Sequence, residues 1–277
     1  MGDLDLLRGR LQELGRVVVA FSGGADSAFL AWVASDTLGP HAAQAVTAVS
    51  PSLAPAEAAD CRALAAEWGL RWREVQTDEL ARPAYVANGT DRCAHCKAEL
   101  MDVVGPLAEA EGATVVLGTN LDDLGDHRPG QRVTAERGAA FPLVDAGFTK
   151  AAVREESRRL GLRTWDKPAA ACLASRMPYG TPVTLGTLDR VARAEAALSA
   201  LGFGQLRVRH YGDLARVELD PADLATAVAR RGEVVAALKS AGYRYVTLDL
   251  EGFRSGNLNP DSAPGRPTPA SDRESSP

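Results

Sequence analysis

Residues Ser22–Ser27, with the sequence Ser-Gly-Gly-Ala-Asp-Ser, have the composition of a loop that binds phosphate. Gly23 and Gly24 lack a Cβ atom, so backbone amides can approach an anion closely there. A helical pattern starts near Asp26, and the free N–H groups at a helix N-terminus favour negative charge. The loop matches neither a Walker A motif nor the dinucleotide motif Gly-x-Gly-x-x-Gly. It therefore predicts a phosphate site of another class.

The cysteines form a second group of reactive residues. There are four, Cys61, Cys93, Cys96 and Cys172, too few to staple a chain of this size with disulfides. A Cys-x-x-Cys pair with a distant third cysteine is typical of metal or redox chemistry in a reducing compartment. Cys61 lies inside a predicted helix, where we expect a buried structural thiol. For the other three, zinc, a cluster and free thiols stay open, although a closed zinc site needs four ligands and His95 is poorly placed as the fourth.

A second polar loop follows another predicted strand. It spans residues 118–130 and contains Asp123. Ligands of an open α/β sheet bind beyond the carboxyl ends of its strands, so we expect both loops to face one site. Asp26 and Asp123 offer the hard oxygen ligands that suit Mg²⁺ on phosphates. Lys150 and Arg154, one turn apart at a helix start, either reach pyrophosphate or form a surface pair.

Alternating strands and helices surround these loops. Residues 17–21 are apolar without alternation, as in a strand buried on both faces of a parallel sheet. Further strands are predicted at 44–49, 70–76 and 114–117, and helices at 3–14, 26–38, 55–68, 98–111 and 149–160. This order is typical of an α/β fold with a doubly wound, mostly parallel sheet.

The pattern changes after residue 166. Three prolines make residues 167–184, which carry Cys172, a rigid connector. A smaller α+β unit follows, with helices predicted at 185–201 and 221–240 and strands at 205–210, 215–219 and 243–249. Residues 255–277 are rich in Pro, Ser, Gly and charge, and we expect a disordered tail. The predicted division is therefore 1–166, 167–184, 185–254 and 255–277.

The composition narrows the class of protein. A chain of 277 residues with 45% hydrophobic and 24% charged residues is ordinary for a soluble globular protein of two modest domains. The net charge of −5 argues against broad contact with nucleic acid, which needs a basic surface. No apolar run approaches the roughly 20 residues of a membrane span, and the N-terminus lacks a signal-peptide pattern. We therefore expect a cytoplasmic protein without a membrane partner.

Together these motifs resemble the LarE family of ATP-dependent sulfur transferases, within the PP-loop ATP pyrophosphatase superfamily. The resemblance covers about residues 4–253 and rests on Ser22–Ser27, Arg92-Cys93-x-x-Cys96-Lys97, residues 118–130, and the stretch from Lys167-Pro168 through Cys172 to Tyr179-Gly180. It implies that ATP adenylates a carboxylate of pyridinium-3,5-biscarboxylic acid mononucleotide, with release of pyrophosphate. A thiocarboxylate is then formed for a nickel-pincer nucleotide cofactor. The resemblance also implies a homo-oligomer.

The resemblance assigns roles to individual residues. It places ATP and pyrophosphate at Ser22, Gly23, Gly24, Asp26, Ser27, Asp123 and Lys150, with Mg²⁺ at Asp26. It places the substrate in the small domain and connector, at Ser175, Arg176, Glu195, Arg207 and Arg209. Arg207 and Arg209 alternate on a predicted strand and so share a face, and paired guanidinium groups suit a phosphate. The alternatives are a solvated strand edge for the two arginines and an exposed helix face for Glu195.

Two sulfur sources are compatible with the resemblance. In single-cysteine members, the thiol that matches Cys172 gives up its own sulfur and leaves dehydroalanine. This chain also has Cys93 and Cys96, like the three-cysteine members, whose thiolates can hold a [4Fe-4S] cluster with one iron open for an extra sulfide. Arg176 and Lys167 are candidate cations that would favour the Cys172 thiolate.

Two other functions remain as alternatives. A PP-loop thiolase acting on transfer RNA would also use ATP and cysteine-held sulfur, but the acidic charge and the lack of a recognisable RNA-binding appendage argue against it. A non-catalytic nucleotide sensor would use Cys93 and Cys96 as a zinc or redox switch. The intact loop with Asp26 and Ser27 counts against that sensor.

Overall fold

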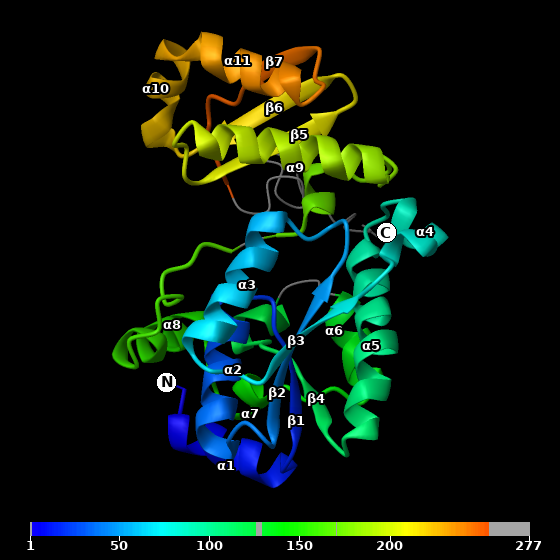
Figure 1. Cartoon of the computed structure of the whole chain (residues 1–277), viewed down its shortest axis with the longest axis vertical. Helices are drawn as coiled ribbons and strands as arrows, with labels where there is room; N and C mark the ends of the chain where they lie inside the picture. Colours follow the sequence, from blue (N-terminus) through cyan, green and yellow to red (C-terminus); the bar gives the residue numbers. More distant parts are fainter. Residues whose placement is uncertain (1, 126–128, 170, 255–277) are drawn as a thin grey trace, which may run out of the picture.

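The computed structural model describes residues 2–125, 129–169 and 171–254 and arranges them around two β-sheets (Figure 1). The predicted tail 255–277 and residues 126–128 of the second polar loop lie outside the described residues. The larger sheet is parallel, with the strand order β3-β2-β1-β4. Its strands are β1 (Val17–Ala20), β2 (Ala43–Val49), β3 (Trp72–Gln76) and β4 (Thr114–Val116). The predicted α/β fold with a parallel sheet is confirmed.

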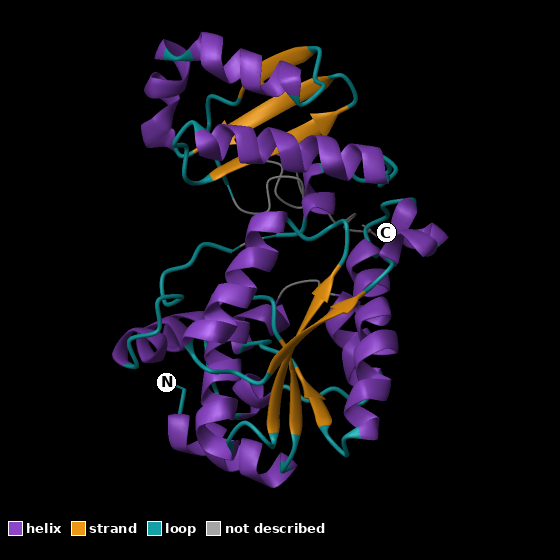
Figure 2. Cartoon of the chain, in the orientation of Figure 1, coloured by secondary structure: helices purple, strands orange, loops and turns teal. Residues whose placement is uncertain are grey.

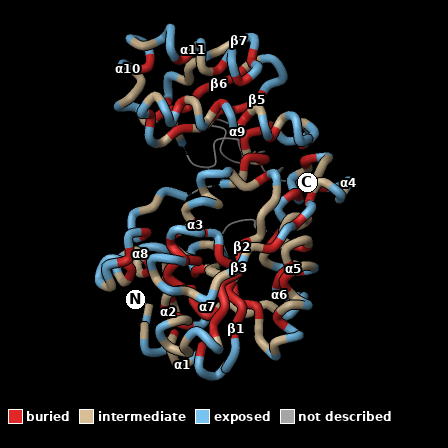
Figure 3. The backbone as a smooth tube through the Cα atoms, in the orientation of Figure 1, coloured by how far each residue is buried: buried red, intermediate tan, exposed pale blue. Residues whose placement is uncertain are grey.

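The central strand β1 explains why this sheet forms where it does. Residues 17–19 pair with β2 on one side and with β4 on the other. Val17 and Val19 pack into the hydrophobic cluster on one face, and Val18 packs into the cluster on the opposite face. An apolar strand without alternation is therefore stable only at the centre of a sheet that is covered on both sides. The strands of this sheet consist largely of buried residues, which are red in Figure 3.

Helices cover both faces of the larger sheet (Figures 1 and 2). One face is covered by α1 (Leu4–Leu14), α2 (Ala25–Leu38), α3 (Pro55–Glu67), α7 (Pro142–Asp145) and α8 (Lys150–Arg159). The other is covered by α5 (Arg92–Ala110), against which α6 (Pro129–Glu136) packs. Short helices connect these elements, namely η1 (Glu79–Ala81), α4 (Pro83–Val86) and η2 (Leu121–Gly125). Within the described ranges, no helix is both long and apolar enough to cross a membrane.

The second sheet is small and mixed. Its order is β5-β6-β7, with β5 and β6 antiparallel and β6 and β7 parallel. Its elements are α9 (Leu185–Ala200), β5 (Leu206–Tyr211), β6 (Leu214–Leu219), η4 (Pro221–Asp223), α10 (Leu224–Ala229), α11 (Arg231–Ser240) and β7 (Tyr245–Leu248). The face with Val208 and Val217 packs against α9 and α11 in a separate hydrophobic cluster. The opposite face carries Arg207 and Arg209 at neighbouring positions of β5.

Three predicted elements differ from the structure. The helix predicted at 98–111 begins at Arg92, so Cys93 and Cys96 lie in its first turns. The local helix propensity of these residues is weak, and the extra turns are stabilised by tertiary hydrogen bonds of the buried Arg92. The helix predicted at 221–240 is divided at Arg230, whose backbone (φ −97°, ψ 23°) is not helical. The connector contains one helical turn, η3 (Leu173–Arg176), directly after Cys172.

Candidate active site

The loop Ser22–Ser27 folds around the hydroxyl of Ser27. This oxygen accepts from the Ser22 amide (3.2 Å), lies 3.0 Å from Ser22 Oγ and donates to the Gly24 carbonyl (3.2 Å). Gly23 has a φ of +69°, and a Cβ atom there would lie 2.8 Å from Cys61 Sγ. Both the conformation and the space therefore require glycine. The turn leads directly into α2, so its N-terminal amides stay available to an anion.

The second polar loop lies directly against the first. A Cβ atom on Gly118 would be 2.7 Å from the Ser27 backbone nitrogen, so the two chains are in contact at this point. The Asp123 carboxylate accepts from the Asn120 amide (3.1 Å), and Asp122 accepts from the Lys150 amide (2.7 Å). These bonds join the loop to the start of α8. The two loops therefore meet at the carboxyl edge of the sheet, as the sequence predicts.

Asp26 lies at the centre of this junction. Its Oδ1 atom is buried and has no hydrogen-bond partner among the described residues. Burial raises the pKa of Asp26, and the nearby Asp123 raises it further, whereas Lys150, the neighbouring Asn120 side chain and Arg154 lower it. The structure thus brings together the predicted phosphate and metal residues of both loops and of α8. A buried carboxylate oxygen without a partner suits a hard cation such as Mg²⁺.

Lys167 lies at the start of the connector and reaches the phosphate loop. Its Nζ donates to the Gly23 carbonyl (3.1 Å) and to the Glu57 and Asp60 carboxylates (2.8 and 2.7 Å). Arg154 donates to the Lys167 carbonyl (3.1 Å). This differs from the expected role of Lys167 beside Cys172, because these three acceptors use all three of its N–H groups. Lys167 instead connects the loop to the segment that carries the cysteine.

Three of the four cysteines cluster where α5 meets the connector. Cys96 and Cys172 are half-buried and pack on one hydrophobic cluster with Tyr85, whereas Cys93 is exposed on the first turn of α5. Burial raises the pKa of Cys96 to about 12, and the neighbouring Cys172 and Glu79 raise it as well. The fourth thiol, Cys61, is apart from them beneath Gly23, where burial raises its pKa to about 11.

The three clustered thiols have the donor chemistry of an iron–sulfur ligand set. In residues 2–125, 129–169 and 171–254, however, no three His, Cys, Asp or Glu side chains form a group that could hold a metal ion as they stand. The cysteines therefore lie near one another without the geometry of a ligand set. Cluster binding would require their side chains to turn toward a common centre.

Arg176 and Glu195 join the connector to the small sheet. Arg176 is buried and forms a two-bond ion pair with Glu195 (2.9 Å for each bond). Its Nη1 also donates to the backbone carbonyls of Ala171 (2.6 Å) and Cys172 (3.0 Å). Glu195 accepts a further bond from the Val208 amide (2.9 Å). Glu195 therefore does not lie on an exposed helix face, and Arg176 orients the backbone at Cys172.

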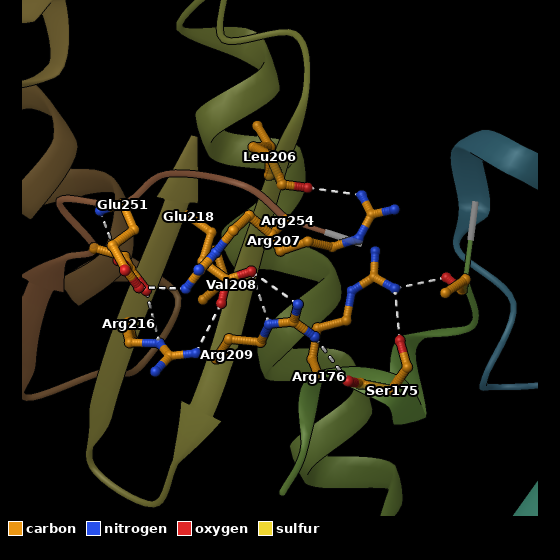
Figure 4. Close-up of polar contacts among 12 residues, drawn as sticks. Ser175, Arg176, Leu206, Arg207, Val208, Arg209, Arg216, Glu218, Glu251 and Arg254 are labelled. Atoms are coloured by element: carbon orange, nitrogen blue, oxygen red, sulfur yellow. Dashed lines mark hydrogen bonds and ion pairs between the residues drawn. The ribbon is translucent and has the colours of Figure 1, made fainter. Parts of the chain in front are cut away.

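Arg207 and Arg209 lie side by side but have different partners (Figure 4). Arg209 is buried, pairs with Glu218 (2.8 Å) and donates to the carbonyl of Ser175 (3.0 Å). Among the described residues, Arg207 donates only to the carbonyls of Leu206 (2.7 Å) and Ala169 (2.9 Å), and it lies 4.9 Å from the Phe253 ring centre. Burial lowers the pKa of Arg207 to about 10, and the neighbouring Arg176 and Arg209 lower it too. A guanidinium crowded by other cations would gain from a bound anion.

Several residues near the thiols have no role that the sequence predicts. Asn88 and Arg92 are buried and bonded to each other, and Arg92 reaches the connector. Glu79 is also buried, and its Oε1 lies 3.8 Å from Cys96 Sγ. Arg92 stands out in the sequence only as part of the cysteine motif, and no prediction from the sequence concerns Asn88. Their burial depends on tertiary contacts, which no local pattern encodes.

Comparison with known proteins gives one family model and three relatives. A model described as NAD synthase matches residues 4–98. An uncharacterized protein of Synechocystis sp. is 48% identical over 259 residues, 92% of this chain and 96% of the relative. The pyridinium-3,5-bisthiocarboxylic acid mononucleotide synthase of Lactiplantibacillus plantarum is 38% identical over 250 residues, 90% of this chain and 91% of the relative. An uncharacterized protein of Methanocaldococcus jannaschii is 25% identical over 241 residues, 87% of this chain and 91% of the relative.

Proposed function

Because the chain belongs to the LarE family of ATP-dependent sulfur transferases, we propose that it converts a carboxylate of pyridinium-3,5-biscarboxylic acid mononucleotide to a thiocarboxylate. The relative from L. plantarum is named for the corresponding bisthiocarboxylic acid mononucleotide. The observation that carries the proposal is the contact between the phosphate loop and the connector, the segment on which Cys172 lies. Lys167 bonds to the loop at Gly23 and stands five residues before Cys172.

The first step uses the loop and the residues around Asp26. A substrate carboxylate oxygen attacks the α-phosphorus of ATP, and the bond from that phosphorus to the bridging oxygen breaks. The products are an acyl adenylate and pyrophosphate. The amides of residues 22–27 and the Lys150 ammonium would hold the pyrophosphate, and Asp26 would hold Mg²⁺ through its unpartnered Oδ1.

The substrate phosphate is proposed to bind at Arg207. Within the part of the chain that the structure describes, this guanidinium has carbonyl partners only, whereas the neighbouring Arg209 and Arg176 are held by Glu218 and Glu195. The three arginines together would supply a positive field, and Arg207 would supply the free N–H donors for a two-bond contact. Ser175 lies next to this group, because its carbonyl accepts from Arg209.

The second step transfers sulfur near Cys172. A sulfur nucleophile attacks the carbonyl carbon of the acyl adenylate, and the bond from that carbon to the AMP oxygen breaks. If Cys172 is the donor, its Cβ–S bond then breaks, with loss of the α-proton, and dehydroalanine remains. A [4Fe-4S] cluster held by Cys93, Cys96 and Cys172 would supply an exchangeable sulfide instead. In both cases Arg176 holds the connector backbone at Cys172 in place.

The test measures sulfur transfer and its source in one experiment. Anaerobically purified protein is assayed for iron and acid-labile sulfide, then for substrate-dependent pyrophosphate release and thiocarboxylate formation. A triple Cys93→Ala, Cys96→Ala and Cys172→Ala variant is the control. About four irons with several turnovers support the cluster. An iron-free protein that loses the mass of H₂S at Cys172 after one turnover supports the sacrificial route. No substrate-dependent pyrophosphate release contradicts the proposed function.

The domain boundaries and the assembly are part of the same proposal. We propose a PP-loop domain over 1–166, a connector over 167–184 and a substrate-binding domain over 185–254, because each sheet has its own hydrophobic cluster. The family resemblance supports a homo-oligomer. Limited proteolysis would test the boundaries, and light scattering with size-exclusion chromatography would measure the mass in solution.

A further inference from the structure

The clustered thiols come from two segments far apart in sequence, and backbone hydrogen bonds join these segments. Cys93 and Cys96 lie on α5, and Cys172 lies on the connector. The Gly180 amide donates to the Asn88 carbonyl (2.9 Å), and the Val183 amide donates to the Val86 carbonyl (2.9 Å). The connector is thus attached to the turn that precedes α5.

Asn88 makes the central contacts of this joint. It is fully buried, and its φ of +56° is a left-handed conformation that Asn tolerates better than most residues. Its Nδ2 donates to the carbonyls of Pro178 (2.8 Å) and Thr181 (2.9 Å). Both side-chain N–H groups are therefore used on the connector, and the side-chain oxygen remains for Arg92.

Arg92 extends the joint toward the cysteines. It is 5% exposed, and its Nη1 donates to Asn88 Oδ1 (2.5 Å) and to the Ala174 carbonyl (2.9 Å). Arg92 directly precedes Cys93, and Ala174 is two residues after Cys172. One guanidinium group therefore fixes the backbone beside a thiol on each segment. Its buried charge also interacts electrostatically with Cys172 and Cys93.

We propose that Asn88 and Arg92 form a clasp that holds the thiols of α5 and of the connector together before any metal or sulfur species binds. The inference rests on the cluster route of the proposed function, in which these thiols act as one group. Both members are positioning residues, because their side chains act through the backbone of the cysteine segments. Holding reactive groups in place in advance removes part of the entropic cost of bringing them together later.

The test measures thiol proximity in metal-free protein and needs no activity. Chelator-treated, reduced protein is reacted with dibromobimane, a short reagent that becomes fluorescent when both ends bind thiols, and the bridged peptides are identified by mass spectrometry. The variants are Arg92→Met and Asn88→Gly, the second of which keeps the left-handed backbone. Arg82→Met is the matched control, because Arg82 pairs with Glu99 of α5 (2.7 Å) but forms no hydrogen bond or ion pair with the described residues of the connector.

We expect bridging of Cys172 to Cys93 or Cys96 to slow about tenfold in both clasp variants and to stay unchanged in Arg82→Met. Near-ultraviolet circular dichroism shows whether each variant is folded, and Asn88→Gly decides the question if Arg92→Met does not fold. Unchanged bridging in a folded clasp variant overturns the proposal. A wild type that bridges rapidly but releases no pyrophosphate with the substrate contradicts the proposed function and leaves the clasp standing.

Discussion

Replacing Lys167 with Met should weaken both the fold and the binding of ATP. The change removes the ammonium that bonds to Glu57, Asp60 and the Gly23 carbonyl, at a side chain only 17% exposed. A hydrogen bond to a charged group contributes about 1.5–3 kcal/mol, and partial exposure of the two carboxylates (26% each) reduces the loss. We expect a net destabilisation of about 2–3 kcal/mol, which lowers Tm by about 5–10 °C in a chain of this size.

The effect on ATP follows from the Gly23 carbonyl, which loses its side-chain donor. The loop amides then lose their fixed orientation toward pyrophosphate, and we expect the KM for ATP to rise about tenfold. Arg163→Met is the matched control, because Arg163 also pairs with Asp60 (2.7 Å) but, among the described residues, forms its other ion pair with Glu67 and none with the loop. Differential scanning fluorimetry and pyrophosphate release measure the two effects. A Lys167→Met enzyme with a lowered Tm and the wild-type KM for ATP would refute this reasoning.

The same ion pair sets a pH dependence of stability. Burial raises the pKa of Asp60, but hydrogen bonds from Lys167 and Arg163 outweigh it, so the pKa lies below 3.8. Burial lowers the pKa of Lys167, but its bonds to Asp60 and Glu57 outweigh it, so the pKa lies above 10.5. The stabilisation is therefore lost as pH falls through the depressed pKa or rises through the elevated one. The difference in unfolding free energy between wild type and Lys167→Met should be constant over about pH 5–9 and shrink below pH 3.8.

Four further substitutions separate other parts of the site. Gly118→Ala should abolish ATP binding in a calorimetric titration, because its Cβ would lie 2.7 Å from the Ser27 nitrogen; normal binding would contradict the contact. Asp26→Asn should raise the Mg²⁺ concentration needed for half-maximal pyrophosphate release by about tenfold, and an unchanged Mg²⁺ dependence would exclude Asp26 as a ligand. Arg209→Ala should cost about 3–5 kcal/mol of stability in urea unfolding, because it breaks a buried ion pair. Arg207→Ala should keep that stability but raise the KM for the mononucleotide about 10-fold to 100-fold. Equal losses of stability in both variants would contradict the assignment of a structural role to Arg209 and a binding role to Arg207.

The larger sheet is predictable from sequence because its signals are local. The uninterrupted apolar run before Ser22 fits only a strand covered on both faces, and Gly23 with Gly24 marks the turn after it. The division of residues 221–240 at Arg230 is less predictable, because apolar spacing continues across the break. The start of α5 is hidden for a different reason. Buried contacts of Arg92 with the distant connector stabilise a turn that local propensity leaves open.

The site is only partly predictable from the sequence, because the partners of its side chains depend on tertiary contacts. Residue types and spacing indicate a phosphate loop, an acidic second loop and a set of thiols, and the structure brings each group together. The sequence cannot distinguish the two arginines of β5, because their difference depends on Glu218 of the adjacent strand. Proximity in sequence also misleads for Lys167, which stands near Cys172 in the chain but bonds to α3 and the loop.

The clasp also sets an order in which this protein can mature during synthesis. Asn88 and Arg92 bond to partners 82–93 residues further along the chain, so their contacts form only after the connector has left the ribosome. Until then the nascent chain carries Cys93 and Cys96 with no partner thiol from the connector. We expect both to be modified rapidly by a thiol reagent in chains stalled before residue 170, and Cys96 to be protected in chains released at full length. Equal modification of Cys96 in stalled and released chains would show that this thiol is not enclosed when the chain is completed.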